Sequence, residues 1–125
     1  MMPLLVIALG GALGAVTRFL VAQYVNQLLG ATFPYGTLVV NISGSFLMGF
    51  LAVLFLEILP PLSMLWRAAL LVGFLGGFTT FSAFSWETVD LLLQGDSFKA
   101  VSNIFLSVGL CLCATWLGVI LARHL

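Results

Sequence analysis

The sequence has very little charge. Of its 125 residues only 6% are Asp, Glu, Lys or Arg, and four basic residues balance four acidic ones. A soluble domain carries roughly 25% charged residues, so this chain cannot cover itself with an ordinary hydrated surface. It also has no basic patch that could neutralise phosphates, which excludes nucleic acid as a partner.

Histidine and cysteine are scarce as well. The single histidine, His124, lies at the C-terminal end without a nearby nucleophile or carboxylate cluster, so no general acid–base pair can be assembled and we expect no enzyme. Cys111 and Cys113 are two residues apart on one expected helix and point to different sides. This spacing predicts neither a disulfide nor a zinc site.

Long apolar runs dominate what is present, since 62% of the residues are hydrophobic. A helix needs about 20 mostly apolar residues to cross a bilayer, so the chain accommodates four crossings and no soluble domain. We expect one transmembrane domain over 1–125, with helices at about 3–28, 37–58, 63–93 and 98–123. The first run has no preceding basic residues and exceeds signal-peptide length, so we expect it to be retained as a helix.

Turn residues separate these expected helices. Gly30, Pro34 and Gly36 interrupt the apolar pattern after the first helix. Pro60 and Pro61 end the second helix, and Ser63 can cap the third. The sequence Gly95-Asp96-Ser97 combines a turn with a cap before the fourth helix.

The basic residues are divided evenly between the two ends of such a bundle. With four crossings, Arg67 and Arg123 lie near one face, whereas Lys99 and Arg18 lie towards the other. Orientation follows the Lys/Arg bias of short loops, and here that bias is absent. A chain inserted in both orientations could form an antiparallel two-fold dimer. A single orientation set by other features is the alternative.

Helix-weakening residues gather in the middle of the third expected helix. The charge-free window 68–86 has its midpoint at Gly77, beside Gly76 and shortly before Thr79 and Thr80. Glycines can simply allow close helix contact. A break near the middle of the membrane is the second interpretation, which the neighbouring hydroxyls favour. Carbonyl oxygens freed by such a break suit a hard cation such as Na⁺.

Polar residues form stripes on two other helices. Thr37, Asn41 and Ser45 recur every four residues on the second helix, and the fourth helix repeats this spacing. Its stripe consists of Asn103, Ser107, Cys111 and Thr115. Beside a polar helix break, the stripes predict the wall of a narrow path, and hydrogen bonding between helices is the alternative.

Phe81 and Phe84 share a face with the expected break. Phenylalanine on a membrane helix ordinarily packs against lipid or protein. An aromatic ring also has a positive edge, so a pair of rings lining a pore could stabilise an anion without a full charge. Lost water would then be replaced by the donors Asn41, Thr80, Ser82 and Ser85.

Arg18 and Glu87 are charged residues within the expected helices. Arg18 is the one charge deep in the first helix, where insertion costs roughly 2.5–3.5 kcal/mol at a helix centre, so it is either functional or snorkels to the interface. Glu87 lies near the outer end of the third helix, where we expect a structural role. No helix centre carries an acid, which disfavours proton coupling.

The segment from Gly76 to Ser85, followed by Glu87, closely resembles the third-helix signature of the CrcB/Fluc fluoride channels. Matches elsewhere extend the resemblance over nearly the whole chain: Gly10-Gly11, Arg18, the run Pro34-Tyr35-Gly36-Thr37-Leu38, Asn41 and Thr115. Ala83 and Leu110-Cys111 depart from the usual pattern.

The resemblance implies a bacterial inner-membrane channel that exports fluoride passively and confers fluoride resistance. It implies a four-helix subunit in an antiparallel, dual-topology homodimer with two pores. The edges of Phe81 and Phe84 would contact fluoride, Asn41 would be the pore asparagine, and the carbonyls of Gly76 and Thr79 would hold a structural Na⁺ on the dimer axis. The polar track of the family falls on Ser82, Ser85, Ser107 and Thr115.

Two other functions remain open at this point. A small proton-coupled multidrug exporter is also a four-helix antiparallel dimer, but it needs a membrane-embedded carboxylate where this chain has Arg18. A non-transporting membrane assembly subunit would use the small residues only for helix contact.

Overall fold

The fold is an all-helical bundle, and the computed structural model describes residues 1–59 and 64–125. Within these ranges four segments are long and apolar enough to cross a membrane, as expected: Met2–Leu29, Tyr35–Ile58, Met64–Leu93 and Ser97–Arg123. They lie close to the ranges 3–28, 37–58, 63–93 and 98–123 expected from the sequence. The features expected at Pro60, Pro61 and Ser63 lie outside the described residues.

The two middle segments are composite. The first segment is the helix α1 (Met2–Leu29). The second consists of α2 (Tyr35–Val53) and a π-helical end, η1 (Leu54–Ile58). The third consists of α3 (Met64–Arg67), the π-helical η2 (Ala68–Leu75), α4 (Gly76–Phe78) and α5 (Phe81–Leu93). The fourth segment is α6 (Ser97–Arg123).

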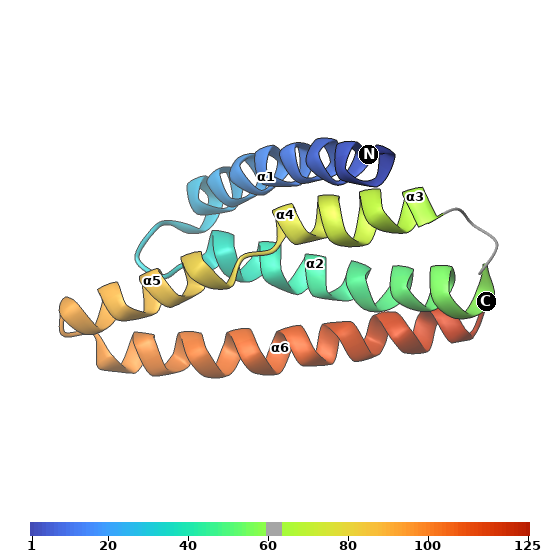
Figure 1. Ribbon diagram of the computed structural model, residues 1–125. Helices are drawn as coiled ribbons and strands as arrows, with labels where there is room; N and C mark the ends of the chain where they lie inside the picture. Colours follow the sequence, from blue (N-terminus) through green and yellow to red (C-terminus); the bar gives the residue numbers. More distant parts are fainter. Residues whose placement is uncertain (60–63) are drawn as a thin grey trace.

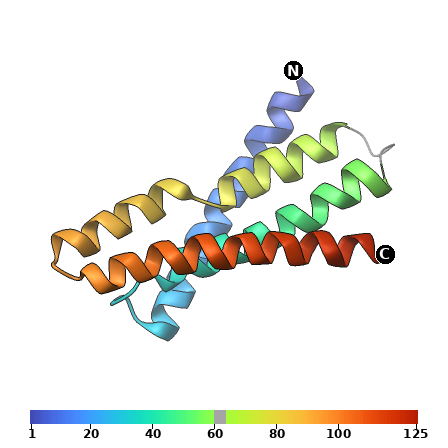
Figure 2. The ribbon, with the colours of Figure 1, turned by 90° about the horizontal axis from the view of Figure 1, so that it is seen from below.

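Successive segments run in opposite directions between the two ends of the bundle (Figure 1). Both chain termini and α3 lie at one end, and the turns that join α1 to α2 and α5 to α6 lie at the other. The helices α2 and α6 lie side by side for most of their length, whereas α1 crosses the other helices obliquely (Figure 2). Arg67 in α3 and Arg123 at the end of α6 are therefore at the end opposite to Lys99, which is in the first turn of α6.

Glycines allow α1 to approach the third segment at backbone distance. A β-carbon on Gly10 would collide with the carbonyl of Ala69, and one on Gly14 would collide with the carbonyl of Phe74. Gly77 meets the backbone of Gly11 in the same way. Gly76 differs, because no atom lies within 4 Å of the position of its β-carbon. Close helix contact thus accounts for Gly77 and leaves Gly76 open on the surface.

The pair α2 and α6 is held by equally close contact and closed by an ion pair. Gly118 of α6 packs on the carbonyl of Phe46, and Gly49 of α2 packs on that of Thr115. At the end of the pair, the Arg123 guanidinium donates to both carboxylate oxygens of Glu57, at 2.9 and 3.2 Å. This packing fixes the facing polar sides of α2 and α6 relative to each other.

Candidate functional site

The third segment is interrupted between α4 and α5. Thr79 and Thr80 have extended backbones, with ψ angles of 154° and 119°. The amide of Thr79 still donates to the carbonyl of Leu75 at 2.9 Å, so the first half ends there. The hydroxyl of Thr80 then accepts from the amide of Ala83 at 3.1 Å and caps α5.

Asn41 of α2 holds the interruption from the side. Its Oδ1 accepts from the amide of Thr80 at 2.8 Å, and its Nδ2 donates to the carbonyl of Thr80 at 2.9 Å. Backbone groups freed in an apolar medium need such partners, because water is not available to bond them. A carboxamide has two amide hydrogens, so one hydrogen of Nδ2 is left for the space beside it.

Two carbonyls lose their helical donors at the interruption. In a continuous helix the amides of Thr80 and Ala83 would donate to the carbonyls of Gly76 and Thr79, four residues back. Both amides instead donate to side chains, those of Asn41 and Thr80. The carbonyls of Gly76 and Thr79 are therefore available to another ligand, and the surface at Gly76 is open.

The oxygen atoms at the interruption belong to backbone carbonyls and neutral side chains. No group of three His, Cys, Asp or Glu residues in the described part of the chain could hold a metal ion. A cation at the interruption would thus be held by neutral oxygen atoms such as these carbonyls, and these suit hard cations.

A cavity of about 400 Å³ lies beside the interruption. It is an open cleft between the polar side of α2, the start of α5 and the facing side of α6. Its lining combines an amide, hydroxyls, a thiol and two phenyl rings with apolar residues, and no charged side chain takes part in it. The lining residues are Asn41, Gly44, Ser45, Met48, Thr79, Thr80, Phe81, Phe84, Ser107, Val108, Cys111, Leu112 and Thr115.

Most residues proposed from the sequence for the fluoride path meet in this cavity. Asn41, Thr80, Phe81, Phe84, Ser107 and Thr115 line it. Ser82 and Ser85 do not: the Ser82 hydroxyl lies 3.2 Å from that of Thr80, and the Ser85 hydroxyl donates to the carbonyl of Phe81. Ser45 and Cys111 belong to the predicted stripes and line the cavity as well, although only the stripe pattern pointed to them.

The two phenyl rings bridge the inside and the outside of the subunit. Phe81 and Phe84 have ring centroids 5.3 Å apart and planes tilted by 50°. Phe84 is buried at 8% exposure, whereas Phe81 is 76% exposed. Phe81 therefore lines the cavity from its outer edge and presents much of its ring to whatever surrounds the subunit.

A buried polar chain supports the cavity from behind. Ser107 donates to Oδ1 of Asn103 at 3.3 Å, and Nδ2 of Asn103 donates to the hydroxyl of Thr88 at 2.9 Å. Thr88 in turn donates to the carbonyl of Phe84 at 2.7 Å. Asn103 is 1% exposed and lies outside the cavity lining, so it ties two walls of the cavity together.

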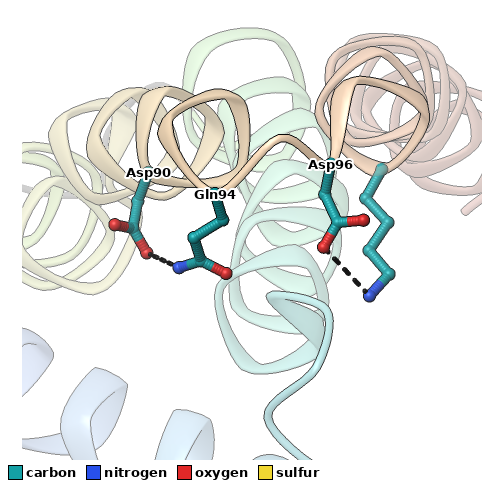
Figure 3. A network of polar contacts seen from close by, with 4 residues as sticks. Asp90, Gln94 and Asp96 are labelled. Carbon is teal, nitrogen blue, oxygen red and sulfur yellow. Dashed lines mark hydrogen bonds and ion pairs between the residues drawn. The ribbon is translucent and has the colours of Figure 1, made fainter.

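A second, more polar cavity of about 300 Å³ lies at the end of the bundle near the turn between α5 and α6. Glu87 contributes to it and accepts from the hydroxyl of Thr37 at 2.7 Å through Oε1. Figure 3 shows the polar pairs at this turn, where Gln94 donates to Asp90 and Lys99 lies 3.5 Å from Asp96. These charged residues line the second cavity, and none of them lines the cavity beside the interruption.

Arg18 is not brought into the first cavity or into this second one. It lies on α1, where its side chain is partly exposed.

Comparison with known proteins gives a consistent result. Residues 5–119 match the family model described as CrcB-like protein, Camphor Resistance (CrcB). A fluoride-specific ion channel FluC of Coxiella burnetii (strain Dugway) is 50% identical to this chain. The aligned region covers 99% of this chain and 100% of that relative. That of Geobacter metallireducens is 48% identical over the full length of both chains. The FluC of Methylococcus capsulatus is 54% identical over 98% of this chain, which spans only 53% of that relative.

Proposed function

The chain belongs to the CrcB-like family, and on this premise we propose that it is a fluoride-specific ion channel of a bacterial membrane. Four apolar helices and relatives named as fluoride channels support a multi-pass protein that acts on fluoride within the lipid bilayer. The single observation that carries the proposal is the uncharged cavity beside the interrupted helix.

The cavity offers what a small, strongly hydrated anion needs. Fluoride would exchange water for the spare Nδ2 hydrogen of Asn41 and for the hydroxyls of Thr80, Ser107 and Thr115. The edges of Phe81 and Phe84 add positive electrostatic potential without fixed charge. Binding that relies on neutral donors remains weak enough for the ion to leave, which conduction requires.

The hydroxyls are already engaged when no anion is bound. Ser107 donates to Asn103, and Thr115 donates to the carbonyl of Cys111 at 3.0 Å. Because a hydroxyl hydrogen rotates about its C–O bond, each can turn towards a passing anion and return. We therefore propose passive movement along the fluoride gradient. Fluoride that enters as the neutral acid dissociates at cytoplasmic pH, so the net direction is export.

A second copy of the chain would complete the channel. Phe81 is 76% exposed although it lines the cavity, and the surface at Gly76 is open. A partner packed on this side would enclose Phe81. The equal distribution of Arg67 and Arg123 against Arg18 and Lys99 supports an antiparallel, dual-topology homodimer, in which two-fold symmetry gives two pores.

A Na⁺ on the axis of that dimer is the second part of the proposal. The carbonyls of Gly76 and Thr79 fit such an ion, because the amides that would otherwise bond them donate to Asn41 and Thr80. The two-fold axis would supply each carbonyl twice. The ion would stabilise the interruption electrostatically and would take no part in anion transfer.

Ion efflux from liposomes tests the function. Purified protein is reconstituted into vesicles loaded with potassium fluoride or potassium chloride, and valinomycin carries the compensating K⁺. We expect rapid fluoride efflux and chloride efflux close to that of protein-free vesicles. Equal rates for the two anions would refute selectivity. Drug-driven proton flux would favour an exporter, and absence of flux together with co-purification in a larger complex would favour an assembly subunit.

A further inference from the structure

The pairing between Asn41 and Thr80 joins residues 39 positions apart in the sequence. A carboxamide carries a donor and an acceptor side by side, so it can bond both the backbone N–H and the backbone C=O of one residue. Thr80 is 9% exposed, and polar groups at such depth gain more from a hydrogen bond than they would in water. The pairing is therefore a strong local constraint on the backbone at Thr80.

This constraint acts on one donor in particular. If the third segment were a continuous helix, the amide of Thr80 would donate to the carbonyl of Gly76. Oδ1 of Asn41 takes that amide instead, at 2.8 Å. The availability of the Gly76 carbonyl thus depends on a side chain of another helix.

A glycine of α2 allows the extended residues of the third segment to lie close to Asn41. One turn beyond Asn41 lies Gly44, and a β-carbon there would collide with Cγ2 of Thr79. The extended residues Thr79 and Thr80 consequently rest directly on α2, where Asn41 can reach them. Asn41 also lines the cavity, so one residue contacts both the anion space and the interruption.

We propose that Asn41 is a positioning residue that keeps the third segment interrupted, and that it thereby leaves the carbonyl of Gly76 available to a cation. The positioning role rests on the observed hydrogen bonds. The effect on a cation rests on the proposed Na⁺ site. It gives Asn41 a role that is separate from any hydrogen bond to fluoride.

Three variants in detergent-solubilised full-length protein test the role. Asn41→Leu removes both hydrogen bonds, Asn41→Asp keeps an oxygen for the amide of Thr80, and Ser43→Ala is the control. Ser43 is on the same helix, bonds only carbonyls of its own helix, those of Val39 and Val40, and does not line the cavity beside the interruption. The two measurements are NMR of backbone shifts and amide exchange at residues 79–81, and the shift of melting temperature on titration with Na⁺ in place of N-methyl-D-glucamine.

We expect Thr79 and Thr80 to have extended shifts and a protected Thr80 amide in the unmodified protein, in Ser43→Ala and in Asn41→Asp. Asn41→Leu should lose the protection or convert these residues to helical shifts, and its apparent Na⁺ affinity should fall about 10- to 100-fold, as when an orienting partner of a metal site is removed. Rescue by Asn41→Asp would separate positioning from loss of packing.

An exchange rate of the Thr80 amide in the unmodified protein equal to that of an unbonded amide would overturn the inference, even if Asn41→Leu does not fold. Extended shifts and an unchanged Na⁺ response in Asn41→Leu would overturn it as well. The outcome is independent of the proposed function: absence of fluoride flux with a protected Thr80 amide would refute the channel and leave the positioning role in place. Absence of any Na⁺ response in the unmodified protein would refute its cation half alone.

Discussion

At the scale of single residues, the site works with neutral groups that are already bonded. Asn41 uses its oxygen and one hydrogen on Thr80, and Ser107 uses its hydrogen on Asn103. Such groups can line a narrow path without binding an ion as strongly as a charged side chain would. An anion on the proposed path would therefore compete with existing hydrogen bonds at each step, which favours passage over tight binding.

The exposed ring of Phe81 gives the first prediction. In Phe81→Leu the positive ring edge is lost while apolar volume is largely kept, so fluoride efflux from liposomes should slow by about tenfold, equivalent to roughly 1.4 kcal/mol. Phe105→Leu is the matched control, because Phe105 is similarly exposed at 73% and does not line the cavity. Unchanged flux in Phe81→Leu would show that this ring is not part of the path.

The cysteines provide a second prediction without any added label. Cys111 lines the cavity, whereas Cys113 is exposed on the outside of α6. Silver ion, added as nitrate in chloride-free buffer, binds soft thiolates and should stop fluoride flux by occupying the cavity. Cys111→Ser should resist silver, and Cys113→Ser should remain sensitive. The reverse pattern would place the path on the other side of α6.

The residue scale also shows where sequence reasoning ends. Five residues of the two predicted stripes line the same cavity, because helical spacing holds along α2 and α6, whereas Thr37 and Asn103 bond to side chains of α5. Ser82 and Ser85 were grouped with Thr80 as neighbouring hydroxyls and through the family resemblance, and they do not line the cavity. Each follows directly after a phenylalanine of α5 that does line it, and successive residues of a helix point about 100° apart, so the serines lie on a neighbouring face.

At the scale of elements, close glycine contacts hold the interrupted segment in place. The third segment loses helical backbone bonding from the amide of Thr80, which donates to Asn41, and α1 packs on its first half at backbone distance. The contact leaves no space for a side chain on Gly14, where a β-carbon would meet backbone atoms of Phe74 and Phe78.

Alanine substitutions of two glycines should therefore have opposite effects. Gly14→Ala forces α1 away from the third segment, and overpacking of this kind typically costs about 1–3 kcal/mol. Gly109→Ala has open space and should stabilise α6 by roughly 0.5–1 kcal/mol, since alanine favours the helix. Unfolding free energies in mixed detergent provide the comparison. Equal destabilisation by the two substitutions would contradict the importance of the contact between α1 and the third segment.

Much of the element order follows from sequence, and the internal geometry of the third segment does not. Apolar run length and turn residues predicted four helices because each crossing must satisfy its own backbone. The π-helical residues Ala68–Leu75 carry no distinctive local signal. Likewise, the pairing of Asn41 with Thr80 depends on a contact between distant parts of the chain, which local periodicity does not encode.

At the scale of the whole molecule, parts of the proposed anion and cation sites lie at the surface of the subunit. Phe81, which lines the cavity, is mostly exposed, and Gly76 is exposed with no atom within 4 Å of the position of its β-carbon. An antiparallel partner would cover both and would bring two copies of the interruption together. The proposed channel is then a property of the dimer.

Charge placement tests the orientation of that dimer. Lysines added after Leu125 should direct the end with both termini to the cytoplasm, and the substitutions Ala31→Lys and Thr32→Lys, at exposed positions of the opposite end, should direct that end inward. Each variant expressed alone should yield vesicles with little fluoride flux, and co-expression should restore it. Full activity of both variants expressed separately would contradict the antiparallel assembly.

The central claim is that the protein conducts fluoride selectively and passively. The most direct test is the reversal potential of single channels or of many channels in a planar bilayer, measured with opposed gradients of fluoride and chloride. For a tenfold fluoride gradient the account predicts reversal at about 59 mV, the value set by fluoride alone. Reversal that follows the chloride gradient, or no current at all, would contradict it.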